Sequence, residues 1–281
     1  MRHIGFHLSA AGGPDRALER ARELGIDTVQ IFLKNNNRWE GPAITEKQAE
    51  NFMRLRNKEG FSHLFAHAGY LINPAGDGEV LTKSRRALAD ELYRASQLKV
   101  PHLVIHPGSH RDLGRDEGMR RIIETLDTAL QQDPGDTVIL LETTAGQGTS
   151  IGHRFEDLAE IIEGSRQTER LAVCLDTCHI FAAGYGLVEP QEYEETISRF
   201  NRILGLDLLK LIHLNDSKKE QGSRVDRHEH IGEGLIGDRG FANLLNDPRL
   251  EEIPLVLETP KPDPESDRRN LARVQSLIKR K

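Results

Sequence analysis

The chain has 281 residues, of which 37% are hydrophobic and 29% charged, so it can form a large buried core. No run approaches the roughly 18 to 20 apolar residues of a membrane-spanning helix, and the first ten residues, MRHIGFHLSA, contain no apolar signal core. We therefore expect one soluble, cytoplasmic domain over residues 1–281, without a membrane partner. The 44 acidic residues outnumber the 38 Lys and Arg, and this formal net charge of −6 by itself argues against nucleic acid as a partner.

The chain contains two cysteines, Cys174 and Cys178, in an apolar segment that we predict to be a buried strand. Secreted domains stabilised by disulfides carry more cysteines, spread along the chain. We expect both thiols to be small buried hydrophobic groups and neither metal ligands nor redox groups.

Eight short β-branched runs alternate with amphipathic segments of helical length. The predicted strands are residues 4–9, 28–33, 63–68, 102–107, 137–143, 171–177, 208–214 and 253–259. The segments between them repeat apolar residues at spacings of three and four, as helices that face a core do. This alternation predicts parallel strands joined by right-handed crossovers. Eight such units predict a closed (β/α)8 TIM barrel, with an open doubly wound sheet as the alternative fold.

The site of such a barrel lies at the C-terminal ends of its strands. The last six predicted strands carry a potential metal ligand there: His67, His106, Glu142, Asp176, His213 and Glu258. These residues close apolar runs, where an unpaired charge is costly to bury and metal coordination offsets the cost. Residues of the same types at the opposite strand ends precede the runs, and we expect them on a solvated rim: His63, His102, Asp136, Asp207 and Glu252.

Two local clusters extend the candidate site. His179 follows Asp176 by three residues, and the long connection 215–240, a candidate functional loop, contains Asp226 and His228. Residues two apart point to the same side of an extended segment. The nine candidates, five His and four carboxylates, are too many for one tetrahedral ion and imply two or three metals. Mixed imidazole and carboxylate ligands favour Zn²⁺ or Mn²⁺ over Ca²⁺ and Mg²⁺.

Two other features receive a structural interpretation. The segment GEGLIG (232–237) matches the G-x-G-x-x-G pattern, but the preceding RVDRHEHI is not an apolar strand, so dinucleotide binding is not predicted. The remaining histidines are expected to be structural or to support the ligands: His3, His7, His63, His102, His110, His153 and His230.

Eight strings cover nearly the whole chain: HLSAAGG (7–13), HAGYLIN (67–73), HPGSH (106–110), LETTAGQG (141–148), DTCHIFAAGY (176–185), HLND (213–216), GSRVDRHEHIGEG (222–234) and LETPKP (257–262). In this order they closely resemble the motifs of the zinc-dependent AP endonucleases of the endonuclease IV type. The resemblance implies a TIM barrel and an enzyme that hydrolyses the phosphodiester 5′ to abasic sites in double-stranded DNA. It further implies 3′-hydroxyl and 5′-deoxyribose phosphate products and the removal of 3′ blocking groups.

The resemblance also implies roles for the nine ligands. They would hold three zinc ions: one by His67, His106 and Glu142, a second by Glu142, Asp176, His213 and Glu258, and a third by His179, Asp226 and His228. Glu142 would bridge two ions, and Glu258 would orient or deprotonate the attacking water. Mn²⁺ is an alternative at some positions.

By the same resemblance, DNA is contacted by the loop 34–39, with Lys34, Asn35 and Arg38, and by Arg227. Tyr70 and Leu71 are the candidates that fill the gap left by an extruded nucleotide. The sequence departs from the family in having Asn37 where Arg is common, with Arg38 one position later.

The charge of the chain is compatible with this partner. Three Zn²⁺ ions would offset the formal charge of −6, because bound ions are among the largest local charges in such a site. We expect a positive surface around the site from the ions and six basic residues: Lys34, Arg38, Lys218, Lys219, Arg224 and Arg227. We expect a monomer.

Two other functions remain open. Glu142, Asp176, His213 and Glu258 alone would also suit a single-metal sugar isomerase or epimerase of the xylose-isomerase-like barrels. Such an enzyme does not require the other five ligands. The second alternative is a catalytically silent module that binds damaged DNA through the same surface.

Overall fold

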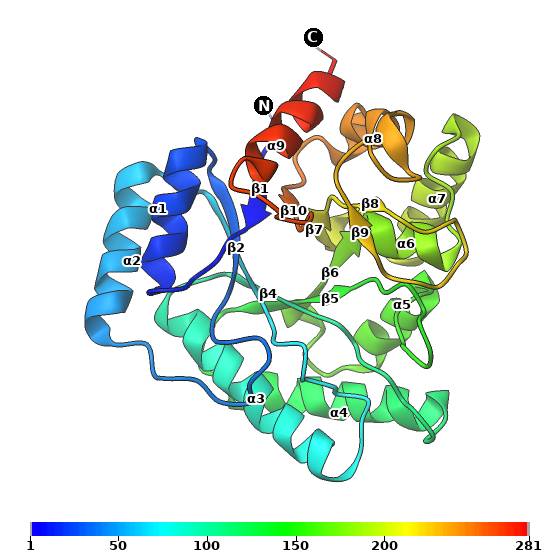
Figure 1. The fold of residues 1–281 in the computed structure, drawn as a ribbon. Coiled ribbons are helices and arrows are strands. Elements are labelled where there is room, and N and C mark those ends of the chain that lie inside the picture. The colour runs from blue at the N-terminus through cyan, green and yellow to red at the C-terminus, as the bar shows by residue number, and fades with distance from the viewer. Residues whose placement is uncertain (1, 280–281) are drawn as a thin grey trace.

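The structure, a computed structural model, describes residues 2–279 and closes eight parallel strands into a barrel surrounded by helices (Figure 1). Around the barrel the strands are β1 (Ile4–His7), β2 (Thr28–Phe32), β3 (His63–His67), β4 (His102–Ile105), β5 (Val138–Glu142), β6 (Leu171–Asp176), β7 (Leu209–His213) and β10 (Leu255–Leu257). Each lies inside one of the eight predicted strands. The predicted TIM barrel is therefore confirmed, and the open sheet is excluded.

The helices connect successive strands around the outside of the barrel (Figure 1). They are α1 (Pro14–Leu24), α2 (Glu46–Glu59), α3 (Gly78–Gln97), α4 (Arg115–Gln132), α5 (Phe155–Gly164), α6 (Thr177–Ala183), α7 (Pro190–Ile203), α8 (Gly237–Leu245) and α9 (Ser266–Leu277). Thr45 begins α2 with a reciprocal capping box to Gln48, and Gly60 ends it in the left-handed conformation. Within residues 2–279, no helix combines the length and apolar character needed to cross a membrane.

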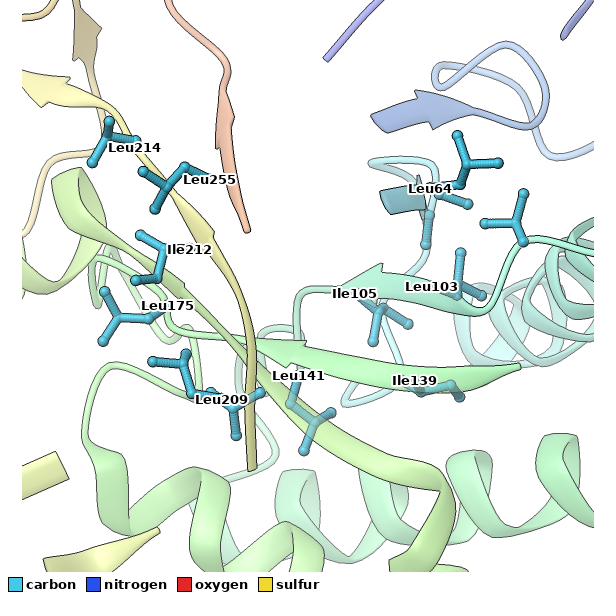
Figure 2. Close-up of a cluster of buried hydrophobic side chains, with 14 of the residues drawn as sticks. Leu64, Leu103, Ile105, Ile139, Leu141, Leu175, Leu209, Ile212, Leu214 and Leu255 are labelled. Atoms are coloured by element: carbon cyan, nitrogen blue, oxygen red, sulfur yellow. The ribbon is translucent and has the colours of Figure 1, made fainter. Parts of the chain in front are cut away.

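Alternate strand residues face the helices and the barrel interior. The outward residues pack with residues of the helices in the large hydrophobic cluster, part of which is drawn in Figure 2. The inward residues form a second cluster: Phe65, Val104, Leu140, Ala172, Cys174, Leu211 and Val256. Six of these precede a predicted metal ligand by two residues. Side chains two residues apart on a strand point to the same face. Each of these six ligands therefore points into the barrel, one layer beyond the inward apolar residue and at the C-terminal mouth.

The prediction for the cysteines is partly wrong. Both are buried and free, as expected, but only Cys174 belongs to a strand, whereas Cys178 lies in α6. The strand ends at Asp176 because its carboxylate accepts the backbone N–H of His179, with Oδ1 and N separated by 2.8 Å, and so caps α6.

The candidate functional loop 215–240 contains a small antiparallel sheet of β8 (Asp216–Ser217) and β9 (His228–Glu229). Asp216 organises the glycine-rich segment after it. Its buried carboxylate accepts backbone N–H groups from four residues of this segment at 2.9–3.2 Å: Gly232, Gly234, Ile236 and Gly237. A Cβ at Gly234 would lie 2.5 Å from Asp216 Oδ1. The glycines of this G-x-G-x-x-G motif therefore let the backbone approach the carboxylate of Asp216, which occupies the turn in place of a ligand phosphate.

Candidate metal centre

The six predicted strand-end ligands meet at the C-terminal mouth of the barrel. Four are the last residues of their strands, and two, His106 and Glu258, follow β4 and β10 directly. Together with the two local clusters they form three groups, in each of which the ligand atoms lie within 4.8 Å of one another. The groups are His67, His106 and Glu142; Glu142, Asp176, His213 and Glu258; and His179, Asp226 and His228. These are the same three sets that the sequence resemblance implies.

Glu142 connects the first two groups. Its Oε2 lies 3.1 Å from His67 Nε2 and 2.9 Å from His106 Nε2. Its Oε1 lies 2.9 Å from His213 Nδ1, which is also 3.2 Å from Glu258 Oε2. The two oxygens of one buried carboxylate thus face two separate sets of imidazoles, as a bridging ligand requires.

The third group joins α6 to the loop 215–240. Asp226 faces an imidazole with each oxygen: Oδ2 is 3.1 Å from His179 Nε2, and Oδ1 is 3.3 Å from His228 Nε2. His228 Nε2 is also 3.7 Å from Asp176 Oδ2, so the second and third groups adjoin.

Four of the imidazoles are oriented by carbonyl oxygens on their far side. The ring nitrogen on that side lies 2.7–3.3 Å from the oxygen. Nδ1 of His67, His179 and His228 faces the backbone oxygens of Ala68, Thr143 and Glu258, respectively, and Nε2 of His213 faces the side-chain oxygen of Gln30. A ring nitrogen that donates its proton to a carbonyl leaves the opposite nitrogen free to bind a cation.

The residues fit zinc chemically. Burial opposes the ionisation of Glu142, but the imidazoles of His106 and His213 hold its pKa well below the usual range. Burial also opposes the ionisation of Glu258, whose pKa is nevertheless lowered, chiefly by His213 and His7. His228 Nε2 is buried and faces the centre, and it makes no hydrogen bond to a described residue although Asp226 Oδ1 lies 3.3 Å away. Ionised carboxylates and imidazole nitrogens at one place are the donors that Zn²⁺ binds.

Two supporting residues complete the centre. Gln30 Nε2 donates to Glu258 Oε1 at 2.7 Å, and His7 Nδ1 lies 3.1 Å from the same oxygen. His7 belongs to the histidines predicted to be structural or supporting, whereas Gln30 was not among the predicted site residues. Its signal in the sequence is an amide side chain at the centre of a predicted strand, TVQIF, and the structure buries it completely.

A cavity of about 550 Å³ opens beside the first and third groups, lined by His106, His179 and Asp226. Tyr70 and Leu71 line it from one side. Tyr70 is 59% exposed and rests edge-on against Phe32, with 5.3 Å between ring centroids. Partial desolvation at the mouth, together with the nearby carboxylates of Glu258 and Glu142, raises the pKa of Tyr70 to about 12. The structure thus brings both candidate wedge residues to the mouth of the centre.

Most of the basic residues expected around the site are exposed: Arg38, Lys218, Lys219, Arg224 and Arg227. Asn35, another residue expected to contact DNA, is also exposed. Lys34 is different. Its side chain is 1% exposed, with Nζ 2.6 Å from Asp90 Oδ2 and 3.5 Å from Glu91 Oε1, so its ammonium is unavailable to a phosphate in this conformation. The predictions that Lys34 contacts DNA and adds positive charge to the surface around the site are therefore wrong for this conformation. Lys34 instead anchors the loop 34–39 to α3. Arg111, which the sequence analysis missed although it follows the HPGSH string, is exposed and lines the cavity.

The chain is similar to known proteins over its whole length. The profile of the xylose isomerase-like TIM barrel family matches residues 18–279. A probable endonuclease 4 of Chloroflexus aurantiacus is 45% identical and one of Geobacter sp. 46% identical, with alignments covering 99% and 98% of both chains, respectively. The structure of endonuclease IV from Thermus thermophilus is 39% identical, with a TM-score of 0.89 over 98% of both chains. A D-tagatose 3-epimerase-like protein, with 19% identity and a TM-score of 0.73, shares the fold. The chain belongs to the endonuclease IV family of xylose isomerase-like TIM barrels.

Proposed function

We propose that this protein is a DNA-repair endonuclease that hydrolyses the phosphodiester 5′ to abasic sites in double-stranded DNA. It leaves a 3′-hydroxyl and a 5′-deoxyribose phosphate, and it also removes 3′ blocking groups. The proposed cofactor is a cluster of three zinc ions, and the proposed unit is one domain that acts as a monomer in the cytoplasm. The observation that carries the proposal is the convergence of nine side chains into three adjoining ligand groups, two of which share Glu142.

The first and third groups favour this function over a single-metal sugar isomerase. An isomerase of this fold would need only the second group, whereas His67, His106, His179, Asp226 and His228 provide further ligands. A phosphodiester has several oxygens that gain negative charge during hydrolysis, and several adjacent cations can stabilise them together. The full-length similarity to proteins named endonuclease 4 supports the same choice.

The residues of the proposed centre would have different roles in the reaction. Zinc ions, when bound, would supply a water of lowered pKa and positive charge opposite the phosphate. Glu258 would orient or deprotonate the attacking water, and its bonds to Gln30 and His7 keep its carboxylate in one orientation. Glu142 and the histidines of the first group would hold the centre in place beside the cavity.

The substrate would be recognised at the cavity beside the centre. Tyr70 and Leu71 would fill the gap in the duplex when the abasic nucleotide is extruded towards the ligands. Arg38, Arg111 and Arg227 would contact the phosphates on either side, because each is exposed and basic. The abasic nucleotide lacks a base to unstack, which lowers the cost of its extrusion relative to an intact nucleotide.

One experiment tests this proposal. Protein with a measured zinc content is incubated with a duplex that carries a single abasic site, with and without a strong chelator, and the product ends are identified. We expect cleavage on the 5′ side that leaves a 3′-hydroxyl and stops with chelator. An undamaged duplex of the same sequence is the control. Turnover of a ketose with one metal per chain would establish the isomerase, and tight binding without cleavage would establish the silent binding module.

A further inference from the structure

Three potential metal ligands also converge at the opposite end of the barrel. His3 directly precedes β1, Asp27 directly precedes β2, and His63 begins β3. One ligand atom from each of the three lies within 4.8 Å of the other two. His3 and His63 were expected to be structural or part of a solvated rim, Asp27 was given no role, and the proposed nuclease mechanism uses none of the three.

The three side chains are already close and partly oriented. His3 Nδ1 lies 3.0 Å from Asp27 Oδ2, and the His3 and His63 rings are 4.1 Å apart between centroids. Two hydroxyl groups orient the carboxylate: Thr28 Oγ1 donates to Oδ1 at 3.1 Å, and Ser62 Oγ donates to Oδ2 at 3.2 Å. Outer partners of this kind hold ligands in position in metal sites.

We propose that His3, Asp27 and His63 form a second, separate binding site for a divalent transition-metal ion of the Zn²⁺ type. Two imidazoles and one carboxylate are a common zinc ligand set, which leaves one coordination position to water. Tetrahedral zinc ligands lie about 3.4 Å apart, so small side-chain rotations complete the geometry from the present arrangement. The ion would replace the hydrogen bond between His3 Nδ1 and Asp27 Oδ2.

The cluster is accessible to an ion from solvent. The side chains of His3 and Asp27 are 32% and 45% exposed. Both line a cavity of about 640 Å³, and His63 lines another of about 490 Å³ at the same end of the barrel. The bound ion would add a metal link between the N-terminal ends of β1, β2 and β3 to the strand pairing and side-chain contacts already there, and it would stabilise the barrel away from the candidate metal centre.

The test counts metal ions per chain. Wild type, His63→Gln and Asp27→Asn are stripped with a chelator and dialysed against Zn²⁺, and the bound zinc is measured by atomic emission. His102→Gln is the matched control, because it removes a histidine from the same end of the barrel but outside the cluster. We expect wild type and His102→Gln to bind the same number of ions, and the two cluster variants to bind one fewer.

The difference of one ion does not depend on how many ions the candidate metal centre holds, so it separates this proposal from the proposed function. Far-ultraviolet circular dichroism and thermal unfolding report that each variant is folded, whatever the activity of the protein. If Asp27→Asn does not fold, His3→Gln replaces it. Equal zinc content in all four folded proteins would overturn the proposal, as would unchanged visible absorption of the Co²⁺-loaded protein after the His63 substitution.

Discussion

Gln30 donates a hydrogen bond to Glu258, with 2.7 Å between Nε2 and Oε1, while the Oε1 of the same glutamine lies 2.8 Å from His213 Nε2. One buried amide therefore orients both a proposed catalytic carboxylate and a proposed zinc ligand. With its Nε2 proton donated to Gln30, His213 presents Nδ1 to Glu142 and Glu258. The amide is suited to this position because it donates to a carboxylate and accepts from an imidazole at the same time.

We expect Gln30→Leu to reduce abasic-site cleavage about 10- to 100-fold, which is typical when a partner behind a metal ligand is lost. The volume of the side chain is nearly kept, so the barrel should remain folded. The expected signature is a fall in kcat with little change in KM, measured in steady-state kinetics. Gln191→Leu, an exposed change on α7, is the control. Unchanged kcat would remove Gln30 from the positioning role.

Glu258→Gln tests the proposed chemical step. The amide keeps the shape of the carboxylate but cannot accept a proton, so we expect cleavage to fall by about 10²- to 10⁴-fold while the Kd for the abasic duplex changes little. Single-turnover cleavage and equilibrium binding measure the two effects separately. Glu265→Gln, an exposed substitution before α9, should change neither. Near-normal cleavage by Glu258→Gln would refute the role of Glu258.

Tyr70→Ala tests the recognition of the substrate. Because Tyr70 is 59% exposed, its loss should not unfold the protein, but it should weaken binding to the abasic duplex about 10- to 100-fold. The reason is the lost stacking of the ring on the bases beside the gap. Tyr93→Ala removes a ring of similar exposure, 57%, from α3 and is the matched control. Equal Kd values for the two variants would show that Tyr70 is not the wedge.

Asp216→Asn tests how the loop 215–240 is held. In the wild type, the backbone N–H groups of the loop donate to the carboxylate of Asp216. The amide of the variant would turn its own N–H group towards some of these donors, so we expect a loss of about 2 kcal/mol in the free energy of unfolding. The loop also carries Asp226 and His228, so zinc bound by the third group should dissociate more readily. Thermal unfolding and the zinc content after dialysis measure the two effects. Glu220→Gln, exposed in the same loop, is the control, and a stable variant with full zinc content would contradict the prediction.

His102 makes the stability of the protein depend on pH. His102, which we expected on a solvated rim, is instead partly buried, and this burial, together with the nearby charge of Lys210, lowers its pKa to about 4 from the ordinary value of 6.5. On acidification the unfolded chain binds this proton first, so stability is full above pH about 6.5 and falls as the pH decreases towards 4. At 1.36 kcal/mol per pKa unit, the loss is at most about 3 kcal/mol.

The variant His102→Gln should lack this part of the pH dependence. Urea unfolding of wild type and variant between pH 7 and 4 measures it, with chelator present in both so that metal loss does not contribute. We expect the difference in unfolding free energy between the two proteins to change across this interval. A constant difference would show that His102 does not titrate as its burial implies.

Much of the barrel and of the candidate site could be predicted because both depend on local periodicity. Inward and outward residues alternate along each strand. A His, Asp or Glu two residues after an inward apolar residue therefore also points inward, at the C-terminal mouth of the barrel. The candidate ligands Asp226 and His228 could also be found, since their spacing places both on one side of an extended segment. The resemblance then supplied the grouping that spacing alone left open.

Contacts between distant segments could not be predicted in this way. Lys34 was expected on the surface because a lysine in a polar loop is usually solvated, but the fold places Asp90 opposite it, 56 residues further along the chain. Cys178 was expected in a strand because the apolar run continues past Asp176, whose capping of α6 ends the strand.

The sequence by itself determined the number of barrel strands, the end of the barrel where the candidate ligands gather and which nine residues are the candidates, because strand periodicity and the order of strand and helix are local properties. Only the tertiary structure decided that Gln30 supports both Glu258 and His213, and that the backbone of the glycine motif surrounds the chain's own Asp216. It also brought His3, Asp27 and His63 together. The physical reason is barrel closure, which sets the distances between side chains on neighbouring strands.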